Sequence, residues 1–126
     1  MLTATILVVD DDPDFVEIMR TILEANSYKV ITASNGEQAL AQVKAHHPDL
    51  MLLDIMMSTV LEGLNVSEQL ALDPDARYMP VIMASSIAET SYAHVFPMGE
   101  QPHMDAWLSK PVDPKVLLAK VKELLN

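Results

Sequence analysis

The chain has 126 residues, no cysteine and a formal net charge of −10, from 8 basic and 18 acidic side chains. This length fits one domain, and the lack of cysteine excludes a disulfide scaffold and any thiolate metal site. The acidic balance argues against binding a nucleic-acid backbone, and no apolar run approaches the ~20 residues of a membrane span. We expect a cytoplasmic domain that contacts neither nucleic acid nor a membrane.

Five short apolar runs alternate with stretches of helical periodicity along the chain. The runs are typical of buried strands and cover residues 6–9, 28–33, 50–54, 81–84 and 106–108. Apolar residues at helical spacing predict helices near residues 15–23, 39–46, 64–71 and 116–124. Because the strands are apolar on both faces and separated by helices, they indicate a parallel sheet covered on both sides.

Capping and turn residues mark the ends of the predicted helices. Asp12 can cap the first helix, Pro13 suits its first turn, and the helix dipole favours Asp14 there. Asn26 and Ser27 are expected to end the same helix. The other boundary signals are a turn at Asn35-Gly36, a stop at Pro48 and an entry through Asp113-Pro114.

Side chains that carry chemistry follow four of the five predicted strands. Asp10 and Asp11 end the first strand, Asp54 the third, Ser85 the fourth and Lys110 the fifth. In an open parallel sheet these ends can meet at the functional crevice. Three carboxylates beside one lysine repel one another, and a hard divalent cation relieves that conflict; oxygen ligands alone select Mg²⁺ over zinc. The set suits phosphoryl transfer with an aspartate as covalent acceptor.

Four motifs in order carry a resemblance to a known family. ILVVDDDPDF, LLDIMM, PVIMASS and WLSKPV, each at a strand end, resemble the response-regulator receiver domain of two-component signalling over about residues 5–125. The resemblance implies a flavodoxin-like fold, in which a doubly wound five-stranded parallel sheet carries helices on both faces. It also implies a signalling domain rather than an enzyme.

The resemblance implies a phosphorylation site with its metal. Asp54 would accept a phosphoryl group from a histidine kinase or a phosphotransfer protein. Asp10 and Asp11 would bind Mg²⁺ together with Asp54, and the main-chain carbonyl of Met56 would complete the metal shell.

The resemblance also implies the residues that respond to phosphorylation. Ser85 and Lys110 would contact the phosphoryl group, and Trp107 would fill the space that the Ser85 hydroxyl leaves. The family usually has Tyr or Phe at the position of Trp107. The bond between Lys110 and Pro111 is a candidate for the cis form.

Two segments depart from the family pattern. After Asp54, Ser58 replaces the usual proline and Gly63 comes one residue later than usual. The segment between Ser85 and Lys110 is about three residues longer than usual, and its prolines exclude a regular helix throughout. We therefore expect a short or irregular fourth helix, with the interruption at Pro97 and Pro102.

Competing interpretations can be weighed on the same residues. Asp10, Asp12 and Asp14 match a calcium loop, but Phe15 and Thr21 stand where that loop requires glycine and glutamate. A phosphatase with an aspartate nucleophile would need a cap or a longer core. The serious alternative is a receiver-fold interaction module that works without a productive phosphorylation cycle. We expect residues 1–126 to form a single receiver domain without an output domain.

Overall fold

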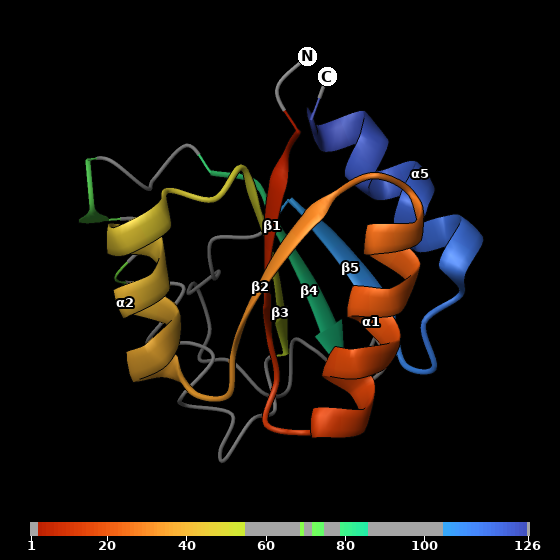
Figure 1. The fold of residues 1–126 in the computed structure, drawn as a ribbon, viewed down its shortest axis with the longest axis horizontal. Helices are drawn as coiled ribbons and strands as arrows, with labels where there is room; N and C mark the ends of the chain where they lie inside the picture. Colours follow the sequence, from red (N-terminus) through yellow and green to blue (C-terminus); the bar gives the residue numbers. More distant parts are fainter. Residues whose placement is uncertain (1–2, 55–68, 70–71, 75–78, 86–104, 126) are drawn as a thin grey trace, which may run out of the picture.

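The structure, a computed structural model, describes residues 3–54, 69, 72–74, 79–85 and 105–125. These residues contain one sheet of five parallel strands in the order β2-β1-β3-β4-β5, which confirms the predicted sheet (Figure 1). The strands are β1 Thr5–Val9, β2 Lys29–Ala33, β3 Leu50–Asp54, β4 Val81–Ser85 and β5 Ala106–Ser109. The described helices are α1 Pro13–Ala25, α2 Gly36–His46 and α5 Pro114–Leu125.

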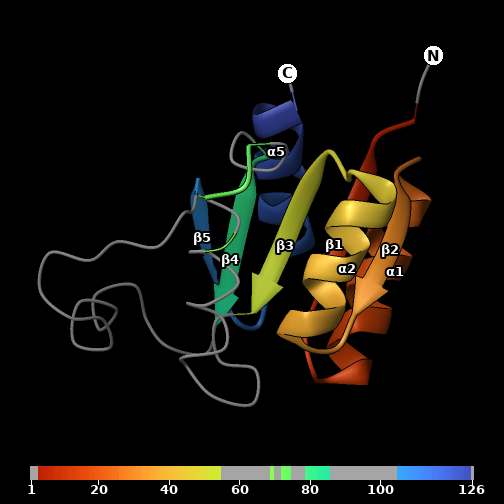
Figure 2. The same ribbon diagram turned by 90° about the vertical axis from the view of Figure 1, so that its left-hand side faces the viewer.

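Helices cover both faces of the sheet, as the apolar strands predicted. Figure 2 shows α2 in front of the strands, with α1 and α5 on the opposite side. Successive side chains of a strand point to opposite faces, so β1 contributes to both cores. Leu7 and Val9 pack in the cluster with α2, whereas Ile6 and Val8 pack in the cluster with α1 and α5. One hydrophobic core therefore packs against each face of the sheet and holds the strands in place.

The predicted capping residues form the ends of α1. The Asp12 side chain accepts a hydrogen bond from the amide of Asp14, and Pro13 is the first residue of the helix. At the other end, the amide of Ser27 donates to the carbonyl of Glu24, and Ser27 has a left-handed φ of 70°. These local bonds fix where the chain enters and leaves the helix.

One boundary prediction needs correction, and the structure adds a detail to another. Tyr28 was assigned to the second strand, but its amide donates to the carbonyl of Leu23, so it closes the turn after α1 and β2 begins at Lys29. The chain bends before α2 at Ser34 and Asn35, in line with the predicted turn, and the Asn35 side chain also accepts a hydrogen bond from the amide of Gln38 and caps α2. In both places a residue outside a helix forms a hydrogen bond with a backbone group at the end of that helix.

Several predictions lie outside the described residues. These are the helix at residues 64–71 apart from residue 69, the altered loop after Asp54 and the short or irregular fourth helix around Pro97 and Pro102. Within the described part of the chain, none of the helices combines the length and apolarity that crossing a membrane requires.

Candidate functional site

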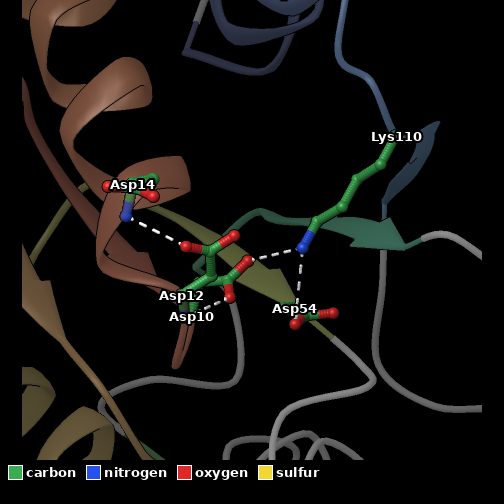
Figure 3. Close-up of polar contacts among 5 residues, drawn as sticks. All are labelled: Asp10, Asp12, Asp14, Asp54 and Lys110. Carbon is green, nitrogen blue, oxygen red and sulfur yellow. Dashed lines mark hydrogen bonds and ion pairs between the residues drawn. The ribbon is translucent and has the colours of Figure 1, made fainter.

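Three charged side chains meet at the carboxyl ends of β1, β3 and β5. Asp10 follows β1, Asp54 ends β3, and Lys110 follows β5. The Lys110 ammonium lies 2.7 Å from Asp10 Oδ2 and 3.5 Å from Asp54 Oδ2 (Figure 3). Both carboxylates are buried, with 1% and 4% of Asp10 and Asp54 exposed. Since a buried carboxylate is costly without a partner, the lysine stabilises both.

The charge of Lys110 is maintained by its two acidic partners. Burial alone would lower the pKa of its ammonium. The hydrogen bond to Asp10 and the charges of Asp54 and Asp10 together outweigh this effect, so the pKa of Lys110 lies above its ordinary value of 10.5. Lys110 is therefore a permanent cation at neutral pH, ready to contact an anionic group.

The beginning of α1 orients the Asp10 carboxylate. The amide of Asp12 donates to Asp10 Oδ1 at 2.9 Å, while Lys110 binds the other oxygen (Figure 3). The same segment brings Phe15 to Lys110, whose ammonium lies 4.2 Å from the centre of the aromatic ring. One oxygen of Asp10 is thus held by the backbone and the other by the ammonium.

Asp11 adds a third carboxylate to this sheet edge. One oxygen each of Asp10, Asp11 and Asp54 lie within 4.8 Å of one another, and Asp11 is exposed. A cleft of about 460 Å³ opens beside Asp10 and Asp11, between α1 and the end of β2. Three carboxylate oxygens close together, two from buried residues and one from the exposed Asp11, fit a hard divalent cation such as Mg²⁺.

The structure gives partial information on the remaining predicted site residues. Met56 lies outside the described residues, and Ser85 is described only as the last backbone position of β4, paired with Ser109 of β5. Trp107 is partly buried and packs against the core on the α2 face. The peptide bond between Lys110 and Pro111 is cis.

Two contacts of this site were not foreseen from the sequence. The amide of Asp12 binds Asp10, although Asp12 was expected only to cap the helix. Phe15 lies against Lys110, although it was assigned only to the apolar stripe of the helix. An aromatic residue in the first turn after an acidic strand end is the signal that could have suggested this second contact.

Comparison with known proteins decides the family. Residues 6–122 match the family model of the response regulator receiver domain. The chain belongs to this family. A solved signal receiver domain of a signal transduction histidine kinase from Syntrophus aciditrophicus is similar, with a TM-score of 0.84 and 28% identity over 98% of this chain and 90% of that one. The strand order and this likeness confirm the flavodoxin-like fold.

Relatives of this receiver domain are response regulators of different lengths. The alkaline phosphatase synthesis transcriptional regulatory protein PhoP of Bacillus subtilis is 36% identical over 121 residues, which are 96% of this chain and 48% of PhoP. The polar-differentiation response regulator DivK of Brucella ovis is 30% identical over 125 residues, 99% of this chain and 98% of DivK. The chain spans about half the length of the transcriptional regulators that it matches. The family model and these relatives together show that the chain is a receiver domain of two-component response regulators.

Proposed function

We propose that this receiver domain is a phosphorylation switch in which Asp54 accepts the phosphoryl group. The observation that carries the proposal is the convergence of Asp10, Asp11 and Asp54 within 4.8 Å, with Lys110 bound to Asp10 and Asp54. Receiver domains of response regulators receive phosphoryl groups from histidine kinases, and a histidine kinase or a phosphotransfer protein is the proposed donor here.

The proposed chemistry is transfer from a phosphohistidine to a carboxylate. An oxygen of Asp54 attacks phosphorus, a P–O bond forms, the P–N bond breaks, and the departing imidazole nitrogen takes up a proton from solvent. Lys110, already a cation 3.5 Å from Asp54, stabilises charge on the oxygens of the transferred group. The product is an aspartyl phosphate at the end of β3.

Asp10, Asp11 and Asp54 are the proposed ligands of Mg²⁺, together with the main-chain carbonyl of Met56. When bound, Mg²⁺ supplies neutralisation of charge on the phosphoryl oxygens. The hydrogen bond from the Asp12 amide leaves Asp10 oriented toward the other two carboxylates. Because the Asp12 amide and Lys110 each hold one oxygen of Asp10, we assign Asp10 the role of metal ligand and Asp54 that of acceptor.

Output is proposed to pass through Ser85 and Trp107. The Ser85 hydroxyl would contact the new phosphoryl group, and the Trp107 side chain would change its surroundings in response. The chain has one tryptophan, so its fluorescence reports this position alone. We further propose that the domain acts in the cytoplasm on a protein partner and not on nucleic acid, since its net charge of −10 opposes contact with phosphates.

Phosphorylation with acetyl phosphate and MgCl₂, followed by intact mass measurement, tests the acceptor. The wild type should gain the mass of one phosphoryl group, whereas Asp54→Asn should gain none because an amide is not an anionic nucleophile. Asp12→Asn is the matched control, since Asp12 is exposed and asparagine retains the helix cap. Equal labelling of Asp54→Asn would put the acceptor elsewhere, and failure of the wild type with several donors would favour an interaction module.

The fluorescence emission of Trp107 tests the switch in the wild type and in Asp54→Asn. Beryllofluoride with MgCl₂ should change the spectrum of the wild type beyond the effect of MgCl₂ alone, and Asp54→Asn should remove that extra change. An unchanged emission spectrum in a protein that the mass measurement shows to be phosphorylated would exclude Trp107 from the switch.

A further inference from the structure

Among the residues that the structure describes, the Lys110 ammonium contacts three groups that come from different segments of the chain. Asp10 after β1 lies at 2.7 Å, Asp54 at the end of β3 lies at 3.5 Å, and the Phe15 ring in α1 lies at 4.2 Å from its centroid. The first two contacts explain the charge balance of the site. The third is made by a residue that the proposed chemistry does not use.

An aromatic ring suits the requirements of this lysine. The ammonium sits on a flexible four-carbon stem, and 20% of the Lys110 side chain remains exposed, so two carboxylates alone leave it free to turn toward solvent. The face of an aromatic ring attracts a cation within ~6 Å. Unlike a third carboxylate, the ring adds no charge that would compete with an incoming phosphoryl group for the ammonium.

The Phe15 ring is itself held in place. It is partly buried and packs against the core formed by α1 and α5. The Asp12 side chain caps the helix just before it, and the Asp12 amide binds the same Asp10 carboxylate that binds Lys110. The first turn of α1 therefore places Asp10 and the aromatic ring on the same ammonium.

We propose that Phe15 is a positioning residue, whose ring holds the Lys110 ammonium between Asp10 and Asp54. The effect of Phe15 on phosphoryl transfer rests on the proposed function of Asp54. The positioning itself does not, because it concerns contacts present before any phosphoryl group arrives. Leucine at position 15 would retain an apolar side chain against the core but lose the interaction with the cation.

A double-mutant cycle measures the positioning without phosphorylation. Phe15→Leu, Lys110→Met and the double variant are unfolded in urea, and the coupling is the deviation of their stabilities from additivity. A cation–aromatic contact at a partly exposed site corresponds to a coupling of about threefold in the unfolding equilibrium constant. Additive effects of the two changes would overturn the proposal.

A nuclear magnetic resonance measurement decides the same point without relying on the Lys110 variant. The methylene protons next to the Lys110 ammonium should be shifted upfield by the aromatic ring in the wild type and in Phe15→Tyr. They should return toward the ordinary lysine position in Phe15→Leu. The same chemical shift in all three proteins would show that the ring does not lie over the ammonium and would overturn the proposal.

Phosphorylation rates then test the consequence for transfer. With acetyl phosphate and MgCl₂, Phe15→Leu should react about threefold more slowly than the wild type, while Phe15→Tyr should remain close to it. Ile18→Ala, at an exposed position of the same helix, is the control for general effects on α1. If the wild type reacts and Phe15→Leu reacts equally fast, the role of Phe15 in transfer is overturned. If the wild type does not react, the function of Asp54 fails, and the urea and resonance measurements still decide the positioning.

Discussion

Two charged networks of this receiver domain have nearly equal distances but different surroundings. At the sheet edge, Lys110 lies 2.7 Å from Asp10, and their side chains are 20% and 0% exposed. On the surface of α1, Arg20 lies 2.8 Å from Glu17, and these side chains are 44% and 61% exposed. The distances alone would rank the two pairs as equals.

The two networks differ in burial, and therefore in how much they contribute to stability and in whether they can take part in a functional site. Water and salt screen the pair on α1, and holding its long side chains in one geometry costs entropy, so such pairs contribute little. At the carboxyl ends of the strands both carboxylates are buried, and removal of the lysine would take the opposite charge away from them. The same conditions strengthen any interaction with an incoming anion or cation. The difference teaches that burial, not distance, marks which pair belongs to a functional site.

The largest expected effect comes from removing the lysine of the buried network. Lys110→Met retains most of the stem but takes the ammonium away from the buried Asp10 and Asp54 carboxylates, and we expect a loss of about 3 kcal/mol in the free energy of unfolding. This loss lies at the lower end of the range for breaking a buried ion pair, because 20% of the Lys110 side chain is exposed. Urea unfolding measures it, with Lys120→Met as control at an exposed pair. If both variants lost the same small amount of free energy of unfolding, burial would not distinguish the two networks.

Magnesium should stabilise the domain through the carboxylates of Asp10, Asp11 and Asp54 and not through the ion pairs on α1. Binding only to the folded state, at ~100 times its Kd, would stabilise the domain by about 2.7 kcal/mol. Thermal unfolding in MgCl₂ is compared with unfolding in NaCl of equal ionic strength, and Asp11→Asn should lose the extra stabilisation. No difference between the two salts for the wild type, even at high MgCl₂, would contradict the metal assignment.

Asp11→Asn should have the opposite effect when divalent cations are removed by a chelator. It takes away one of three carboxylates within 4.8 Å of one another, and Asp11 is the exposed member. Relief of the repulsion should raise the free energy of unfolding by about 1 kcal/mol. Asp14→Asn, an exposed acid in the first turn of α1, is the control. A loss of stability in Asp11→Asn would mean that repulsion does not dominate this edge.

A smaller effect, confined to alkaline pH, follows from the raised pKa of Lys110. Because the folded-state pKa lies above the ordinary value of 10.5, the stability that protonated Lys110 contributes is complete below that value. It is lost as the pH rises through the folded-state pKa. The stability difference between the wild type and Lys110→Met should therefore shrink above pH 10.5, in urea titrations at a series of pH values. A constant difference across that range would contradict the raised pKa.

The smallest effect is expected on the surface of α1. Arg20→Met removes contacts to Glu17 and Glu24, yet it should change the free energy of unfolding by less than about 0.5 kcal/mol. Added salt screens exposed charges further, so the difference in unfolding free energy between Arg20→Met and the wild type should stay small. Urea unfolding of this variant, run beside Lys110→Met, completes the comparison; similar losses in the two would show that exposure does not separate the networks.

Features that depend on neighbours in the chain were predictable from the sequence. The apolar runs at residues 6–9 and 50–54 are strands, because β-branched and aliphatic residues bury both faces of a parallel strand. Asp12 caps α1 because its short side chain reaches an amide two residues away. One feature that does not depend on neighbours was also predictable: because parallel strands bring their carboxyl ends together, we expected Asp10, Asp54 and Lys110 to lie side by side.

Only the tertiary structure decided how those groups pair. Lys110 binds Asp10 more closely than Asp54, and it also contacts the Phe15 ring, although Asp10 and Lys110 are 100 residues apart. No local pattern reports such contacts, because they depend on the order of the strands and on where α1 crosses the sheet. Tyr28 shows the same limit on a small scale: an apolar ring suits a strand, but its amide is needed to close the end of α1. Composition and spacing therefore determine which groups reach the edge, and packing determines which of them touch.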